Sequence, residues 1–235
     1  MKHDITAIFL TNNEVPDKWM EYHNQCLLDA LDGAPIIIMS RKPMKIGENS
    51  INILQDKPRS LSNIYWQLLR ACKVATTDYI AVVEDDTLYP KEHFQQRPNP
   101  KKIGYNMNHW SLFTWIAHHH PKPIYSWRNR RGNYSMLSYR KLVIEALEER
   151  FAKYPNGTED RITGEIGRSM VEHNMGITVR EVEEFETTVS IINFNHANAS
   201  DDLQLRQRKS MGEIRAYDIP HWGKAEDLVK KFYAI

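Results

Sequence analysis

Short apolar segments alternate with an amphipathic segment at the start of this chain, and that order restricts the possible folds. Ile5–Leu10 and Ala34–Met39 are too short for helices and read as buried strands, whereas Trp19–Leu31 has helical spacing and ends at Asp32-Gly33. The continuous apolar run at Ala34–Met39 is typical of a strand that is buried on both faces. A strand-helix-strand order predicts a right-handed, mostly parallel sheet flanked by helices, and therefore an α/β fold.

The same reading extends along the rest of the chain. Ser60 or Ser62 is expected to cap a helix over 62–75. Thr158 is expected to open a helix over 158–173, with Glu159 and Asp160 in its first turn. We further predict strands over 50–54, 79–83, 134–138 and 189–194, a strand pair within 103–115, and helices over 140–154 and 224–232. No segment reads as a linker, so a single domain is expected over 1–235.

Composition excludes several classes of protein. The 31 basic residues nearly balance the 30 acidic ones, which gives no global case for binding nucleic acid or an anionic membrane. Cys26 and Cys72 suit neither a disulfide framework nor a thiolate metal site. The apolar run at Ile5–Leu10 is too short for a signal peptide or a membrane span. A soluble, cytoplasmic protein is expected.

Three consecutive carboxylates follow the apolar strand at Tyr79–Val83, namely Glu84, Asp85 and Asp86. In open α/β sheets, ligands bind at the carboxyl ends of the strands. Three adjacent acids repel one another unless a cation joins them, and a hard divalent cation that shares phosphate oxygens is suitable. The alternative is an ordinary acidic turn, because Asp favours turns and helix starts. The first interpretation predicts a metal-bound phosphorylated substrate at this strand end.

The order of these motifs resembles the GT-A glycosyltransferases, especially those of the family-2 type. A polar loop, 11–14, follows the first strand, and a helix within 59–75 precedes the acidic strand. The acidic motif is Glu-x-Asp here, at Glu84 and Asp86, where that family has Asp-x-Asp. The resemblance covers 4–90 well and 130–200 more loosely. It implies a GT-A, Rossmann-like fold with a nucleotide-sugar-binding half, 1–90, and an acceptor-binding half, 91–235.

The resemblance also implies a metal site. Asp86 is the expected direct ligand, and His196, directly after an apolar strand, is the expected late ligand, with His221 as the alternative. Glu84 would bind the metal through water or hold the ribose hydroxyls, and Asp85 would lie near the ribose. Oxygen and imidazole ligands suit Mn²⁺, with Mg²⁺ also possible.

For catalysis, the resemblance places the general base at Asp160, with Glu159 second. Such a base would deprotonate the acceptor hydroxyl opposite the leaving diphosphate, giving single displacement with inversion. The structural alternative is that these acids only favour a first helical turn.

The nucleotide of the donor, expected to be a UDP-sugar, would lie at the carboxyl end of the first strand. Its expected contacts are Thr11, Asn13, Glu14, Arg59 and Asn63. Helix capping explains Asn63 equally well, and Arg59 also fits a solvated surface position.

The acceptor is left open between a saccharide, a lipid-linked precursor and a hydroxymethylated base of DNA, as in phage DNA glycosylation, which would place the enzyme in the host cytoplasm. Arg128, Arg130 and Arg131 form one basic cluster, and 206–209 holds another; if the two converge, a polyanionic acceptor is expected. His118–His120 is expected to be a polar turn.

Two other functions compete with transfer of a sugar. A nucleotidyltransferase would need a glycine-rich, basic loop after the first strand, and the loop over 11–14 has neither feature. A binding module without catalytic activity is the other alternative, and the intact acids at 84–86 argue against it.

Overall fold

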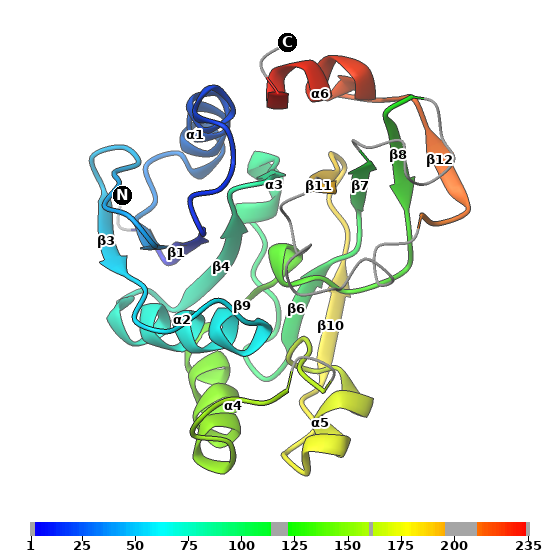
Figure 1. Ribbon diagram of the computed structural model, residues 1–235. Helices are drawn as coiled ribbons and strands as arrows, with labels where there is room; N and C mark the ends of the chain where they lie inside the picture. Colours follow the sequence, from blue (N-terminus) through cyan, green and yellow to red (C-terminus); the bar gives the residue numbers. More distant parts are fainter. Residues whose placement is uncertain (1–2, 114–121, 160–161, 196–210, 234–235) are drawn as a thin grey trace.

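The computed structural model describes residues 3–113, 122–159, 162–195 and 211–233 (Figure 1). A mostly parallel sheet occupies the N-terminal part, in the order β3-β2-β1-β4-β9. Its strands are β1 (Ile5–Leu10), β2 (Ile36–Ser40), β3 (Ser50–Leu54), β4 (Tyr79–Glu84) and β9 (Leu137–Tyr139). Strands β1 to β4 run parallel and β9 is antiparallel to β4. The expected α/β class, with a largely parallel sheet and flanking helices, is confirmed.

Capping residues and residues with positive φ angles mark the ends of two of the helices. They are α1 (Asp17–Leu31), α2 (Leu61–Val74), α3 (Lys91–Phe94), α4 (Arg140–Lys153), α5 (Ser169–Met175) and α6 (Ala225–Tyr233). Asp32 and Gly33 end α1 with φ angles of 52° and 86°, in the left-handed region. The Ser60 hydroxyl accepts a hydrogen bond from the Asn63 backbone N–H at 3.0 Å, so Ser60 is the cap of α2.

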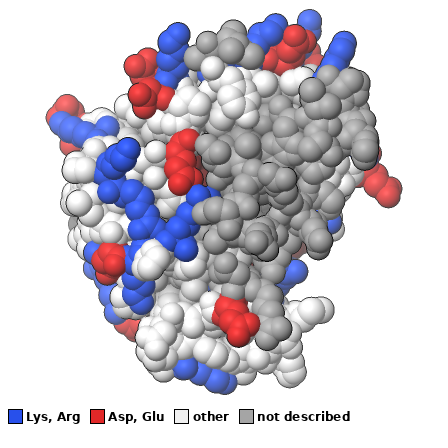
Figure 2. All heavy atoms as spheres, in the orientation of Figure 1, with Lys and Arg blue, Asp and Glu red and all other residues white. Residues whose placement is uncertain are grey.

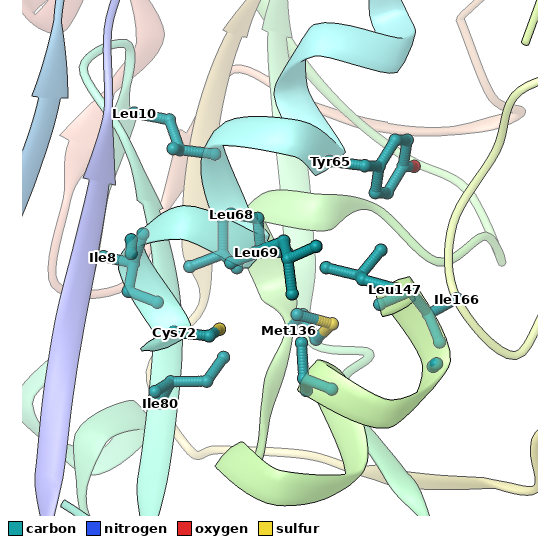
Figure 3. Packing of buried hydrophobic residues seen from close by; sticks show 14 of the residues in the cluster. Ile8, Leu10, Tyr65, Leu68, Leu69, Cys72, Ile80, Met136, Leu147 and Ile166 are labelled. Atoms are coloured by element: carbon teal, nitrogen blue, oxygen red, sulfur yellow. The ribbon is translucent and has the colours of Figure 1, made fainter. Parts of the chain in front are cut away.

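Alternate side chains of β1 point to opposite faces of the sheet, as in any strand. Ile8 and Leu10 join a core cluster with α2 and α4 (Figure 3). Ala7 and Phe9 join a second cluster, which includes residues of α1 and Phe94 of α3. The sheet is thus the middle layer between helices, which explains why its strands are apolar almost throughout. Among the described residues, no helix is both long and apolar enough to cross a membrane.

A second sheet follows in the C-terminal part, in the order β12-β8-β7-β11-β5. Its strands are β5 (Thr87–Leu88), β7 (His109–Phe113), β8 (Ile124–Trp127), β11 (Ile191–Asn195) and β12 (Ile214–Ala216). Trp19 of α1 packs on Phe194 and on Phe232 of α6, with ring centroids 4.5 Å and 5.0 Å apart. The N-terminal helix and the last helix therefore share one core with this sheet.

Smaller pieces complete the fold. Strands β6 (Ile103–Asn106) and β10 (Val182–Phe185) pair in parallel, and β13 (Asp218–Ile219) pairs with β14 (Gly223–Lys224). A bridge between Tyr105 and Met136 connects β6 with the segment before β9. That segment contains a 3₁₀ turn, η2 (Asn133–Ser135).

Two predicted elements need correction. The two strands within 103–115 exist, but β6 pairs with β10 and β7 pairs with β8 and β11, so they do not form a pair with each other. The strand predicted over 134–138 begins only at Leu137, after η2. The predicted turn at His118–His120 lies outside the described residues.

The helix predicted over 158–173 is wrong, because within the described part of that range only α5 forms, from Ser169. Gly167 has a φ of 78°, and a Cβ there would meet the Val182 side chain at 2.4 Å. The buried Glu172 carboxylate accepts hydrogen bonds from the backbone N–H groups of Gly167 at 2.8 Å and Arg180 at 2.9 Å. These contacts hold the segment in a turn, which the helical spacing of the apolar residues does not reveal.

Candidate functional site

The three acids at the end of β4 face two different surroundings. The backbone turns directly after Glu84, the last residue of β4, which pairs with Leu10 at the end of β1. The Asp85 carboxylate accepts a hydrogen bond from the Thr11 hydroxyl, beside the loop that follows β1. Glu84 and Asp86 instead line a large cavity. One short stretch of chain therefore supplies carboxylates to two adjacent regions.

A hydrogen-bond network follows the carboxyl ends of β1, β2 and β3. The Thr11 hydroxyl accepts from the Asn13 backbone N–H at 2.8 Å. Asn13 has a φ of 60°, and its side-chain oxygen accepts from the backbone N–H groups of Arg41 at 2.8 Å and Lys42 at 2.9 Å. This arrangement fixes the loop after β1 and aligns it with the loop after β2.

Gln55 extends the network to α2. Its side-chain amide donates to the Thr11 carbonyl at 2.7 Å, and its oxygen accepts from the Asn63 side chain at 3.0 Å. Asn63 in turn accepts from Gln67 at 2.7 Å. The structure thus brings Thr11, Asn13, Asn63 and Asp85 together. We missed Gln55 in the sequence, although its place directly after a predicted strand was an available signal.

Glu14 and Arg59 form an ion pair of 2.8 Å beside this network. Both side chains are partly exposed, so the pair itself contributes little to the free energy of unfolding. It joins the loop after β1 to the residue before the Ser60 cap of α2. Glu14 and Arg59, two of the residues that are expected to contact the nucleotide, therefore lie next to each other.

Thr11→Val is expected to separate binding from stability. Valine keeps the shape of threonine, but it removes the acceptor for the Asn13 N–H and the donor to Asp85, and each unmet polar group costs about 1–3 kcal/mol. We expect a lower free energy of unfolding in urea and, at the nucleotide site that the sequence predicts here, a weaker affinity for a nucleoside diphosphate.

Thr6→Val is the matched control for this substitution. Thr6 lies near the start of β1, is 2% exposed, and its hydroxyl bonds the Thr77 hydroxyl at 2.7 Å. It is about 16 Å from Thr11 along the strand. Thr6→Val should therefore lower stability without changing nucleotide affinity. Equal losses of affinity in the two variants would show that Thr11 acts only through stability.

The cavity has a volume of about 930 Å³, within the range of sites for small molecules. Its walls come from the end of β4, the start of α2, the segment 128–134, the segment 162–174 and β11. Charged residues of both signs lie among them: Glu84, Asp86, Arg128, Arg130, Arg131, Glu165, Arg168 and Glu184. Figure 2 shows Lys and Arg gathered in one stretch on the face seen there.

Asp86 is 9% exposed and is held by side chains of the second sheet. Its Oδ1 atom accepts hydrogen bonds from the Thr87 hydroxyl at 3.1 Å and from the Asn193 amide at 3.2 Å. The Phe194 backbone N–H donates to the Asp86 carbonyl at 2.9 Å. Strand β11 is therefore fixed against Asp86, and the end of β11 lies near the acids.

At the end of β4, a divalent metal would find two of the carboxylates that line this cavity, those of Glu84 and Asp86. No three His, Cys, Asp or Glu side chains converge into a metal site within the described ranges. The expected late ligand, His196, lies just outside them, directly after Asn195 of β11. The oxygens available suit Mg²⁺ or Mn²⁺.

Two buried residues of α1 fix the backbone of the acidic turn. The Trp19 indole N–H donates to the Asp85 carbonyl at 2.8 Å. His23 Nε2 lies 2.8 Å from the Thr87 carbonyl and 3.1 Å from the Glu84 carbonyl, so this nitrogen carries the proton. Burial lowers the pKa of His23, which keeps the ring neutral. Helical spacing predicted that both residues lie in α1 but gave no sign of these contacts.

The remaining predicted site residues lie elsewhere. Asp160 and the basic cluster at 206–209 are outside the described residues. Glu159 is exposed beside the start of α2, where the Thr158 N–H donates to the Ser62 hydroxyl at 3.2 Å. Glu165, which we did not single out in the sequence, is the acid of this segment that lines the cavity. His221 is exposed and packs edge-on against Trp222, and it is not among the described residues that line the cavity.

Comparison with known proteins gives structural similarity only. No protein-family model matches the sequence, and no curated protein matches it significantly. The glycosyltransferase GlyE of Streptococcus pneumoniae has a TM-score of 0.45 at 9% identity, over 87% of this chain and 49% of that one. The mannosyltransferase PcManGT of Pyrobaculum calidifontis, in complex with GDP-Man and Mn²⁺, has 0.45 at 9% identity, over 87% and 60%.

A putative glucose-1-phosphate thymidylyltransferase of Bacillus anthracis is also similar, with a TM-score of 0.42 at 14% identity, over 89% of this chain and 98% of that one. The chain thus spans about half of GlyE and three fifths of PcManGT. Similar structures include both glycosyltransferases and a nucleotidyltransferase. Because the identities and TM-scores are low, the function proposed below depends on the chain's own residues.

Proposed function

We propose that this protein is a metal-dependent glycosyltransferase that moves a sugar from a nucleotide-sugar, expected to be a UDP-sugar, to an acceptor hydroxyl. The observation that supports this best is the division of the acids at the end of β4. Asp85 joins the polar network around Thr11, whereas Glu84 and Asp86 line the cavity. A nucleotide at the network and a sugar in the cavity would meet at this turn, with the diphosphate between them.

The roles of the residues follow from this placement. Asp86, with His196, would hold Mn²⁺ or Mg²⁺, which neutralises the charge that develops on the leaving diphosphate. Glu84 would bind the metal through water or hold the ribose. Asp160, or Glu159 as the second choice, would deprotonate the acceptor hydroxyl on the opposite side of the sugar, which gives inversion.

The two halves of the chain would divide the substrates. Residues 1–90 would bind the nucleotide-sugar, and 91–235, within one domain, would bind the acceptor. A saccharide and a hydroxymethylated base of DNA are both proposed acceptors. The cavity has polar and aromatic walls, including Tyr65 and Tyr134, which suit a sugar or a base.

A ligand-stability screen tests the proposal. The melting temperature is measured with nucleoside diphosphates, nucleoside triphosphates and nucleotide-sugars, each with and without Mn²⁺. A ligand that binds only the folded state raises the melting temperature, by an amount that grows with its concentration over Kd. We expect a Mn²⁺-dependent rise for one nucleoside diphosphate and its sugar conjugates.

The other outcomes of the screen are equally informative. A rise that requires the triphosphate would favour nucleotidyl transfer, which the similarity to a thymidylyltransferase structure makes worth including. No rise with any nucleotide at saturating Mn²⁺ would overturn the proposal and leave the acids as a structural turn.

A further inference from the structure

Arg130 lines the same cavity as Glu84 and Asp86. It is partly buried, and its NH2 group donates to the Ser111 hydroxyl of β7 at 3.3 Å. Ser111 is a neutral partner, so this bond orients the guanidinium without neutralising it. An arginine has five N–H groups, so the guanidinium keeps several of them for other partners.

The backbone of Arg130 is fixed by a buried histidine. His109 Nε2 lies 2.7 Å from the Arg130 carbonyl, which can only accept, so Nε2 carries the proton. His109 Nδ1 then accepts from the Tyr134 hydroxyl at 3.1 Å. Burial lowers the pKa of His109 to about 4, so the ring stays neutral and this arrangement holds at ordinary pH.

Tyr134 closes the arrangement on the cavity side. Burial is the main cause that raises the pKa of its hydroxyl, whereas the Arg130 charge and a hydrogen bond from Arg130 lower it. A Cβ at Gly132 would meet the Tyr134 ring at 2.7 Å, so the loop needs glycine for this close packing. Arg130 is therefore oriented before any ligand arrives.

The sheet register relates Arg130 to Asp86. Ser111 is the direct partner of Asn193, and Asn193 is the direct partner of Thr87. Direct partners place their side chains on the same face of a sheet, and Asn193 donates to Asp86 on that face. Two strand spacings separate Ser111 from Thr87, or about 10 Å. Ser111, which anchors Arg130, and Asn193, which donates to Asp86, are thus neighbours on one face of this sheet.

Neighbouring arginines differ from Arg130 in their partners. Arg131 forms an ion pair with Glu184 at 2.9 Å, and Arg168 forms one with Glu165 at 3.4 Å. In the part of the chain that the structure describes, no carboxylate lies within ion-pair distance of Arg130. A partly buried cation with only neutral partners is suited to an anionic ligand, and arginine matches phosphate geometry with paired N–H groups.

We propose that Arg130 binds a phosphate group of the acceptor, so that the acceptor of this transferase is a phosphorylated molecule rather than a neutral sugar. This inference rests on the proposed function, since the donor diphosphate is assigned to the metal at Asp86. Ser111, His109 and Tyr134 act as positioning residues, because they hold Arg130 and need not touch the phosphate.

The test compares two probes on the full chain with Mn²⁺ and the nucleoside diphosphate bound. One probe is glucose 6-phosphate, and the other is a short single-stranded oligodeoxynucleotide, which carries phosphodiesters. Titration calorimetry is expected to show that one of them binds the wild type. Arg130→Gln should weaken that binding by about tenfold or more, the usual effect of losing a charge-assisted hydrogen bond. The probe that responds identifies the source of the phosphate.

Controls make the result specific to Arg130. Arg131→Gln removes the same charge one residue away, where Glu184 already neutralises it, and should change the affinity for the probe by less than about threefold. Arg130→Lys keeps a charge and should lie between the wild type and Arg130→Gln. If Arg130→Gln does not fold, Ser111→Ala is the second variant. It removes only the hydrogen bond that orients Arg130, and it should still lower the affinity for the probe.

Three results would overturn the inference. The wild type binds neither phosphate probe while it still binds the nucleoside diphosphate; Arg130→Gln binds the probe as tightly as the wild type; or Arg130→Gln weakens the nucleoside diphosphate instead, which would place Arg130 at the donor. Failure of the proposed function looks different, because the wild type then shows no Mn²⁺-dependent binding of any nucleotide.

Discussion

Asp86→Asn is expected to lower the rate of sugar transfer by about 100- to 1,000-fold, because it removes one charge next to the leaving diphosphate. The asparagine oxygen still accepts the hydrogen bonds that the Asn193 amide and the Thr87 hydroxyl donate to Asp86. The fold should therefore persist while metal binding is lost. Transfer rates, together with the Mn²⁺-dependent rise in melting temperature, measure both effects.

Asp78→Asn is the matched control, since Asp78 precedes the opposite end of β4 and is exposed. It changes the same charge on the same strand without approaching the cavity. We expect a transfer rate and a Mn²⁺ effect equal to those of the wild type. If Asp86→Asn also kept both, the assignment of Asp86 as a metal ligand would be wrong.

Mild acid is expected to destabilise the protein through its buried histidines. His93 is fully buried, and neither ring nitrogen has a hydrogen-bond partner within the described part of the chain. Its ring stacks on Phe185, with centroids 6.2 Å apart, and also contacts Tyr89 and Phe94. Burial lowers the pKa of His93 to about 3, so the folded protein keeps this ring neutral.

The sign of the effect follows from proton binding. The unfolded chain protonates His93 near its ordinary pKa of 6.5, whereas the folded chain does not until about pH 3. The contribution of neutral His93 to the free energy of unfolding is therefore fully present above pH 6.5, and it is lost as pH falls from 6.5 toward 3. At pH 5 the loss from His93 is about 2 kcal/mol. His109, with a pKa lowered to about 4, adds to it in the same direction.

His93→Leu tests this directly by urea unfolding at pH 7 and pH 5. Leucine suits the aromatic surroundings and cannot titrate, so the loss of unfolding free energy between the two pH values should shrink by about 2 kcal/mol. The exposed His173 provides the control, His173→Leu, whose pH dependence should match the wild type. An unchanged pH dependence in His93→Leu would show that His93 is not the source.

Local pattern predicted the first half of the fold well because its signals are local. Strands β1, β2 and β4 are short apolar runs, and α2 has a serine cap that the sequence displays. The same logic predicted that the acids after Tyr79–Val83 lie at the carboxyl end of a buried strand. These elements need no knowledge of distant contacts.

The second half depends on contacts that are far apart in the sequence. The predicted helix over 158–173 fails because Glu172 and Gly167 hold a turn against Arg180. The hydrogen bond from Asn193 to Asp86 spans 107 residues of sequence. The hydrogen bond between Tyr134 and His109 also joins residues from separate segments, which no local sequence pattern reveals. Glu165 enters the cavity for the same reason, since only the turn places it there.

The different contacts of the three acids at the end of β4 also restrict which insertions and deletions this protein tolerates. Asp85 serves the Thr11 network, and its two neighbours serve the cavity. Inserting or deleting one residue between Val83 and Thr87 would turn each carboxylate toward the wrong side, as a register slip does in any strand. Sequences that keep this chemistry should therefore vary the identity of these acids more readily than their number, with glutamate exchanging for aspartate while the spacing stays fixed.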